Sequence, residues 1–325
     1  MKKIALEEHF MAPELEEYWR TTMGNVDPAI YQHVRRRLFD FDELRLSEMD
    51  AAGIEIAVLG LAGPGVQIEP DASKASHAAA RANDFLAEKI GGHPRRYAGF
   101  AHLALQDAAC AGKELERCVR ELKFCGAMIN GHTNGQYLDD PALYPFWERA
   151  QALGAPIYLH PTDPVATYSV LAGCNSLKRA MWEWGLETGS HALRLVFNGV
   201  FDRFPGVKLI LGHLGETLPF LLWRFDSRAK LYGLKLKRRP SEYIKDNIWV
   251  TTSGMCADDP LLCSIRALGH RRVMFSADFP FESVLEAGKF MDAAPLEEPV
   301  KSDVAFRNAA ALLGLEARQP AGAGQ

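Results

Sequence analysis

Short runs of apolar, often β-branched residues alternate along this chain with amphipathic stretches. The runs are almost continuously apolar, which is typical of strands buried on both faces in a parallel sheet covered by helices. We predict eight strands: Lys3–Leu6, Ile54–Leu61, Tyr97–Leu103, Gly126–Asn130, Pro156–His160, Val207–His213, Ile248–Ser253 and Val273–Asp278. The spacing of apolar positions predicts helices over Lys74–Ile90, Lys113–Leu122, Tyr144–Leu153, Leu218–Leu231 and Pro260–Leu268.

This alternation predicts an α/β fold, a (β/α)8 TIM barrel forming a single domain over residues 1–315. A doubly wound open sheet is the alternative, because strand counting does not separate the two. Insertions at 11–41 and 161–184 follow the first and fifth strands, and we expect both to cap the pocket. We expect a solvated turn at 233–243 and a flexible tail at 316–325.

Composition narrows the classes of function. The chain has 325 residues, of which 48% are hydrophobic, and a formal charge of −4, which argues against nucleic acid as a general partner. No apolar run reaches the length of a membrane span, so we expect no membrane partner. The six cysteines form no CxxC pair, and we interpret them as reduced thiols of a cytoplasmic protein.

Side chains that bind metals recur where the predicted strands end. Glu7 and His9 share one face of the first strand, because residues two apart on a strand point the same way. His160 closes the fifth strand, His213 the sixth and Asp278 the eighth. These ends would meet at one mouth of a barrel. Two carboxylates and two imidazoles can bind one divalent ion, either Zn²⁺ or Mn²⁺.

Each of these residues also has a purely structural interpretation. A single histidine ending an apolar strand is commonly a packed core residue, and Asp278 before Phe-Pro could be a turn or N-cap residue. His213 through Glu216 could open a helix, with Glu216 favoured by the helix dipole. Coincidence at all of these strands together is improbable, so the set favours a metal site.

Four motifs resemble the metal-dependent decarboxylases of the amidohydrolase superfamily, which act on γ-resorcylate (2,6-dihydroxybenzoate), 2,3-dihydroxybenzoate or 5-carboxyvanillate. They are Leu6-Glu7-Glu8-His9-Phe10, Tyr158-Leu159-His160-Pro161, Leu211-Gly212-His213-Leu214-Gly215-Glu216 and Phe275-Ser276-Ala277-Asp278-Phe279-Pro280-Phe281-Glu282. The resemblance implies an amidohydrolase-type barrel with one divalent ion, held by Glu7, His9, His160 and Asp278.

The resemblance also implies roles for residues beyond the ligands. His213 and Glu216 match the family's catalytic pair after the sixth strand. Asn130 matches an asparagine after the fourth strand that contacts substrate. Trp223-Arg224 matches a pair whose arginine reaches a neighbouring subunit's active site, which implies a homodimer or homotetramer.

The first motif is Glu-x-His, where most amidohydrolases have His-x-His, and Cys125–Asn130 contains no lysine to bridge two metals. Both features disfavour a binuclear hydrolase. We therefore expect reversible, non-oxidative decarboxylation of an ortho-hydroxybenzoate, with 2,6-dihydroxybenzoate as the first choice, and Asp278 as proton donor to C1. A mononuclear hydrolase of a lactone or amide is the main alternative, and a non-catalytic barrel is the third.

Overall fold

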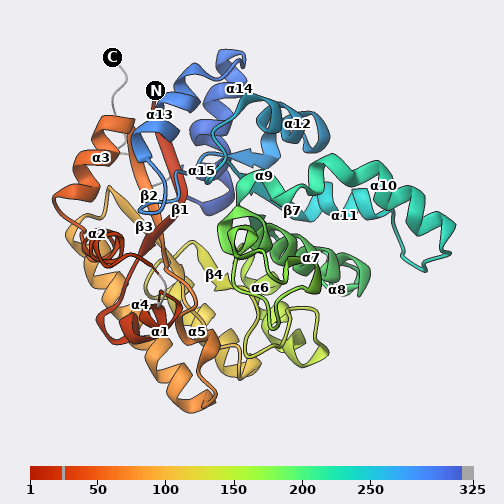
Figure 1. Cartoon of the computed structure of the whole chain (residues 1–325), viewed down its shortest axis with the longest axis horizontal. Helices are drawn as coiled ribbons and strands as arrows, with labels where there is room; N and C mark the ends of the chain where they lie inside the picture. Colours follow the sequence, from red (N-terminus) through yellow and green to blue (C-terminus); the bar gives the residue numbers. More distant parts are fainter. Residues whose placement is uncertain (24–25, 317–325) are drawn as a thin grey trace.

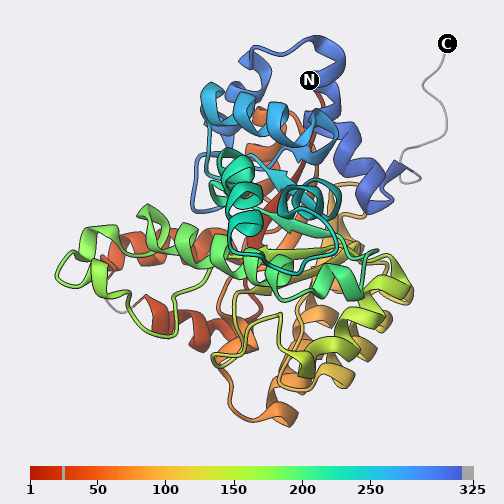
Figure 2. The same ribbon diagram turned by 90° about the vertical axis from the view of Figure 1, so that its right-hand side faces the viewer.

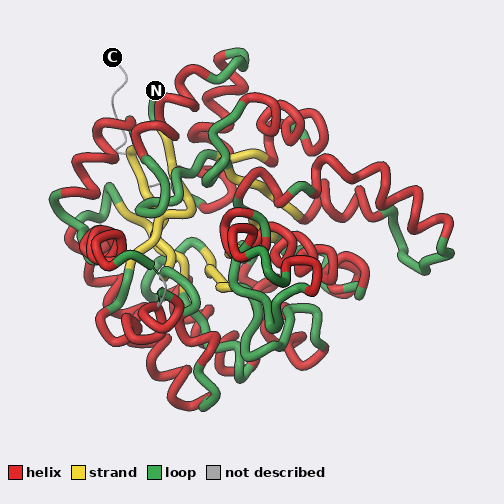
Figure 3. Tube along the Cα trace, viewed as in Figure 1, coloured by secondary structure: helices red, strands yellow, loops and turns green. Residues whose placement is uncertain are grey.

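Eight parallel β-strands follow one another around the sheet, in a computed structural model that describes residues 1–23 and 26–316. They are β1 (Lys3–Phe10), β2 (Ile54–Leu61), β3 (Tyr97–Ala101), β4 (Gly126–Asn130), β5 (Ile157–His160), β6 (Leu209–Leu211), β7 (Ile248–Thr251) and β8 (Val273–Met274). Each strand pairs with the next one in the chain, and helices surround the sheet (Figures 1 and 3). This order confirms the predicted (β/α)8 barrel, because a doubly wound sheet reverses its strand order at the middle.

The helices are α1 (Glu16–Thr22), α2 (Pro28–Leu38), α3 (Leu44–Ala52), α4 (Ala72–Gly92), α5 (Ala108–Arg120), α6 (Tyr144–Leu153), α7 (Glu183–Phe197), α8 (Val200–Arg203), α9 (His213–Glu216), α10 (Leu218–Leu231), α11 (Pro240–Asn247), α12 (Asp258–Leu268), α13 (Val284–Ala293), α14 (Glu298–Ser302) and α15 (Asn308–Leu313). All five predicted helices are present. Helix α5 begins five residues before its predicted start at Lys113, because the Asp107 carboxylate caps the backbone N–H groups of Ala109 and Cys110.

The apolar core has two parts, one between the sheet and the helices and one inside the barrel. Side chains of β1 alternate between them: Ile4 and Leu6 lie inside, and Ala5 faces the helices. Inside the barrel they pack against residues of the other strands and against α15. The packed interior leaves the ends of the strands as the place for polar chemistry.

Strand β1 extends to Phe10, beyond its predicted end at Leu6, whereas β3, β5, β6, β7 and β8 are shorter than predicted. Two of the shorter strands leave site residues outside the sheet. Strand β6 ends at Leu211 and β8 at Met274, so His213 and Asp278 lie in connecting segments beyond the strands. No ladder pairs β8 with β1 in the described chain. Instead, the N–H of His9 donates to the carbonyl of Phe279 at 2.7 Å, so the segment after β8 closes the barrel against β1.

The two insertions lie side by side at one end of the molecule (Figure 2). The first carries α1 and α2, and residues 161–184 form three short 3₁₀ turns before α7. Arg179 joins them by donating to the carbonyl of Thr22.

The prediction of a turn over 233–243 is wrong from residue 240 onward, because Pro240 starts α11. The predicted tail lies outside the described residues from 317 onward, and no described helix is long and apolar enough to cross a membrane.

Candidate metal centre and active site

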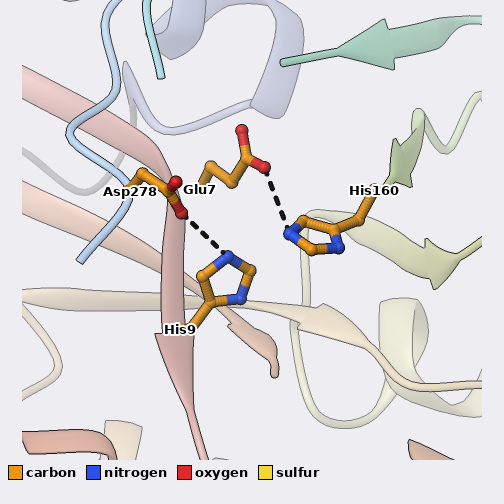
Figure 4. Close-up of side chains that lie close together, drawn as sticks. All are labelled: Glu7, His9, His160 and Asp278. Carbon is orange, nitrogen blue, oxygen red and sulfur yellow. Dashed lines mark ion pairs between the residues drawn. The ribbon is translucent and has the colours of Figure 1, made fainter. Parts of the chain in front are cut away.

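Four side chains from two strands and one connecting segment meet at one end of the barrel (Figure 4). Glu7, His9, His160 and Asp278 each offer one ligand atom, and these atoms all lie within 4.8 Å of one another. His9 Nε2 is 3.2 Å from an Asp278 oxygen, and His160 Nε2 is 3.3 Å from a Glu7 oxygen. The group predicted to hold a metal is therefore brought together by the fold.

A β-bulge in β1 turns Glu7 and His9 toward this centre. Ala5 is opposite Ala57 of β2, but Glu8 is opposite Leu59, so Leu6 and Glu7 together face the single residue between them. Without this extra residue, the alternation begun by Ile4 and Leu6 would place Glu7 and His9 against the helices. Bulges commonly re-aim side chains beside active sites in this way.

The polar atoms at the centre fit a divalent cation. Glu7 Oε1, His9 Nε2 and Asp278 Oδ1 are buried without a hydrogen-bond partner, which is costly unless another group satisfies them. His160 Nδ1 donates to the carbonyl of Pro161 at 2.8 Å, and this bond fixes the tautomer that leaves Nε2 free as a ligand. Two carboxylates would balance the charge of such an ion.

The two ligand imidazoles are held neutral. Burial lowers the pKa of His9 to about 4 and the pKa of His160 to about 3. Desolvation disfavours the charged imidazolium. At neutral pH both rings therefore keep the unprotonated nitrogen that a metal requires.

The two ligand carboxyls differ in their pKa. Burial and the neighbouring Glu7 carboxylate raise the pKa of Asp278 well above its usual range. Burial also acts to raise the pKa of Glu7, but the surrounding imidazoles outweigh it and the pKa falls.

Tyr158 and Gly212 set the orientation of the Glu7 carboxylate, a role that the sequence analysis did not assign although both residues lie within its motifs. The Tyr158 hydroxyl donates to Glu7 Oε2 and lies 2.8 Å from Thr251 Oγ1. A Cβ atom at Gly212 would lie only 2.6 Å from the same Glu7 oxygen, so the close approach requires glycine. Tyr158 and His160 are two residues apart on β5 and therefore share a strand face. This spacing was the signal in the sequence that could have placed Tyr158 at the centre.

His213 is held by Glu216 through an uncommon turn. Residues 213–217 all have positive φ, from 51° to 88°, so α9 is a left-handed turn rather than the start of a right-handed helix. This conformation is strained for every residue except Gly215. It brings His213 Nδ1 to 2.7 Å from Glu216 Oε1, with the ring nitrogen donating to the carboxylate.

His213 also lies close to Asp278. A Cβ atom at Gly254, after β7, would be 3.2 Å from the His213 ring and 3.8 Å from an Asp278 oxygen. Burial opposes a charge on His213, but Glu216 and Glu7 raise its pKa to about 10. A cationic imidazole thus borders the candidate metal ligands.

Asn130 and Arg224 lie in contrasting places. Asn130 is fully buried beside His160 in the β4–β5 register, and its Oδ1 has no hydrogen-bond partner. Arg224 lies on α10, where it is exposed and forms no ion pair or hydrogen bond with any described residue. The fold of one chain therefore does not show Arg224 in the site.

The barrel and its ligand set define a metal-dependent enzyme of the amidohydrolase type, and comparison with known proteins agrees. The chain belongs to the amidohydrolase family, whose model matches residues 31–315. It is 39% identical over 324 residues to a γ-resorcylate decarboxylase from Polaromonas sp. (strain JS666), covering 96% of this chain and 98% of that protein.

Two solved structures are similar over nearly the whole chain. A 2,6-dihydroxybenzoate decarboxylase complexed with 2,6-dihydroxybenzoate has a TM-score of 0.90 and 38% identity, covering 97% of this chain and 99% of that one. A dihydroxybenzoic acid decarboxylase from Polaromonas sp. JS666, with bound manganese and the inhibitor 2-nitroresorcinol, has a TM-score of 0.91 and 39% identity, covering 97% of each chain.

Proposed function

We propose that this protein removes CO₂ reversibly from an ortho-hydroxybenzoate, with 2,6-dihydroxybenzoate as the preferred substrate, and that residues 1–315 act as one catalytic domain. The observation that carries the proposal is the set Glu7, His9, His160 and Asp278 with its unpartnered buried atoms. The similarity to decarboxylases of 2,6-dihydroxybenzoate supports the choice of substrate.

One divalent ion, Mn²⁺ or Zn²⁺, would be held by Glu7, His9, His160 and Asp278. When bound, it supplies Lewis-acid polarisation of the substrate's carboxylate and adjacent phenolic oxygen. The bound manganese of the similar Polaromonas structure supports Mn²⁺. The rest of the mechanism concerns proton transfer and orientation by the protein itself.

Asp278 is proposed to donate the proton to C1 of the ring. Loss of CO₂ directly from a benzoate would leave an unstable aryl carbanion, whereas protonation of C1 first allows the ortho oxygen to hold the electrons as a ketone. Cleavage of the C–C bond then restores aromaticity. Asp278 supplies a carboxyl group at the centre, the kind of side chain that delivers a proton in general acid catalysis.

His213 is proposed to hold a substrate oxygen. Its Nδ1 is engaged by Glu216, which leaves Nε2 directed away from that carboxylate and available to the substrate. Asn130 would contribute a neutral hydrogen bond through its unpartnered Oδ1. Both roles require a polar substituent beside the carboxylate, which fits an ortho-hydroxybenzoate.

We also propose a homodimer or homotetramer in which Arg224 binds substrate at a neighbouring subunit's site. On α10, Phe220 is 80% exposed and Trp223 is 76% exposed, close to Arg224 in sequence. Large exposed aromatic side chains beside an arginine are typical of subunit interfaces.

We also propose a cytoplasmic location. The free cysteines of the described ranges fit a reducing compartment.

The deciding experiment incubates the Mn²⁺-loaded protein with 2,6-dihydroxybenzoate and its isomers in D₂O. We expect CO₂, resorcinol and deuterium at the carbon that carried the carboxylate. With resorcinol and high bicarbonate, the same protein should carboxylate ortho to the hydroxyl. A mononuclear hydrolase would catalyse neither reaction and would instead hydrolyse members of a panel of lactones and amides. A protein inert toward both panels that binds no stoichiometric metal would be the non-catalytic barrel.

A further inference from the structure

Glu8 lies between two proposed metal ligands in sequence but points to the opposite side of β1. Its carboxylate is 3% exposed and accepts hydrogen bonds from three donors of the segment after β8. The N–H of Ala277 is 2.9 Å from Oε1, the N–H of Phe279 is 3.3 Å from Oε2, and Ser276 Oγ is 3.2 Å from Oε1. The two N–H groups flank Asp278, so both oxygens of Glu8 hold the backbone around one metal ligand.

The backbone at Asp278 needs external support. Strand β8 ends at Met274, so no ladder orders the residues that follow. Asp278 itself has a φ of 67°, a left-handed conformation that residues other than glycine rarely adopt. Such a conformation persists where surrounding contacts fix it.

Arg45, on α3, also contacts β1 and the segment after β8. Its guanidinium is buried, donates to the carbonyl of His9 at 2.6 Å, and stacks 4.0 Å from the centre of the Phe279 ring. Burial raises the pKa of Glu8 to about 7, and the positive charge of Arg45 acts against this effect. The charge of Glu8 is thus partly compensated, although Glu8 does not face the metal centre.

We propose that Glu8 is a positioning residue, which fixes the left-handed backbone at Asp278 so that the Asp278 carboxylate closes the metal site. The inference rests on the proposed metal site. If Glu8 acts in this way, its loss weakens metal binding only through Asp278, while Glu7, His9 and His160 keep their places. A merely structural Glu8 would change the stability of the fold and leave the metal affinity of the folded protein unchanged.

The test is a double-mutant cycle on the full-length protein stripped of metal. The dissociation constant for Mn²⁺ is measured by competition with a chelator, for the wild type, Glu8→Gln, Asp278→Asn and the double variant. We expect Glu8→Gln to weaken Mn²⁺ binding about 10–100-fold, the usual effect of a partner that orients a ligand. In the Asp278→Asn background the same change should weaken binding no more than about twofold, because the ligand on which Glu8 acts is already altered.

A matched control is Glu114→Gln. Glu114 is another largely buried carboxylate with several partners, including Asn83 and Arg117, but it lies on α5. Its substitution should lower the thermal midpoint without changing the dissociation constant for Mn²⁺. An unchanged Mn²⁺ affinity in folded Glu8→Gln, or an equal loss in both Asp278 backgrounds, would overturn the proposal.

If Glu8→Gln does not fold, Glu8→Asp replaces it in the cycle, since the shorter side chain keeps the charge but withdraws the carboxylate from the N–H groups of Ala277 and Phe279. Weaker Mn²⁺ binding that disappears in the Asp278→Asn background supports the proposal, and unchanged binding contradicts it. These measurements do not depend on turnover. A protein that fails to decarboxylate hydroxybenzoates would therefore refute the proposed reaction and leave the role of Glu8 to be decided by the cycle.

Discussion

His213 Nδ1 lies 2.7 Å from Glu216 Oε1, although the residues joining them form a left-handed turn that is unfavourable for most side chains. The strained backbone fixes the imidazole next to the proposed metal ligands. Among the groups around His213, Glu216 has the largest effect in raising its pKa. This pairing gives the first prediction.

Glu216→Gln should lower kcat roughly 10–100-fold with a smaller effect on the Mn²⁺ dissociation constant. The substitution keeps the shape but replaces a charge-assisted hydrogen bond, which contributes about 1.5–3 kcal/mol, by a neutral one. Steady-state kinetics and metal titration check this. Glu242→Gln, at the half-buried start of α11, is the control and should leave kcat unchanged, because glutamine keeps an oxygen that accepts the N–H of Arg239. Normal turnover by Glu216→Gln would mean that the pair only stabilises the turn.

His160→Ala should lose the metal and the activity together. The change removes a buried imidazole whose tautomer leaves Nε2 free to bind metal. Loss of a residue that only orients a ligand typically weakens metal binding roughly 10–100-fold, and loss of the ligand itself should weaken it more. Metal content after dialysis and CO₂ release are the measurements. A folded, metal-free and fully active variant would refute the ligand set, as would a stoichiometry of two ions per chain.

Asp278→Asn should bind Mn²⁺ more weakly and remain folded. With metal restored by excess ion, it should still bind 2-nitroresorcinol, but decarboxylation should fall by about 10²–10⁴-fold because an amide cannot transfer the proton. Single-turnover kinetics on the reloaded variant separate the two effects. If turnover stays near normal, Asp278 is only a ligand and the proton must come through another group, with His213 the nearest candidate.

The exposed aromatic face of α10 predicts assembly. Sedimentation of the wild type should give a dimer or tetramer, and Trp223→Asp should shift it toward monomer because burying an unpaired charge opposes association. Arg224→Ala should keep the assembly and the metal but raise KM or lower kcat. A monomeric wild type with full activity would contradict both statements.

Two buried histidines outside the metal centre predict loss of stability in acid. His102 Nε2 accepts the N–H of Val66 at 2.9 Å and His191 Nε2 accepts the N–H of Leu138 at 2.8 Å, so both rings must stay neutral. Burial lowers the pKa of each to about 3, below the unfolded value near 6.5.

Because the folded pKa is the lower one, the unfolded chain binds more protons between these values. The free energy of unfolding should therefore fall as the pH drops below about 6.5, by up to about 1.4 kcal/mol per pH unit for each ring. Urea unfolding of the metal-free protein across this range measures the slope. His191→Gln keeps an acceptor that does not titrate, so it should reduce the slope by the share of one ring, while His102 and the metal-free His9 and His160 still contribute. An unchanged slope would remove His191 from the explanation.

The sequence by itself determined the barrel and which side chains gather at its mouth. Continuous apolar runs fix which segments are buried strands, and helical spacing fixes α6 and α10 to the residue. Glu7, His9, His160 and Asp278 were identified because barrel topology carries the ends of all strands to one mouth. These properties depend on local pattern and on strand order, which the chain itself contains.

Only the tertiary structure decided how those residues are aimed. Alternation along β1 predicts that Glu7 and His9 share a face, but pairing with β2 and the bulge decide which face it is. The hydrogen bonds of Glu8 to the backbone around Asp278 link residues about 270 positions apart. No local pattern in the sequence predicts such contacts. Register and close approach depend on partners distant in sequence, whereas hydrophobic periodicity reports only whether a position is buried.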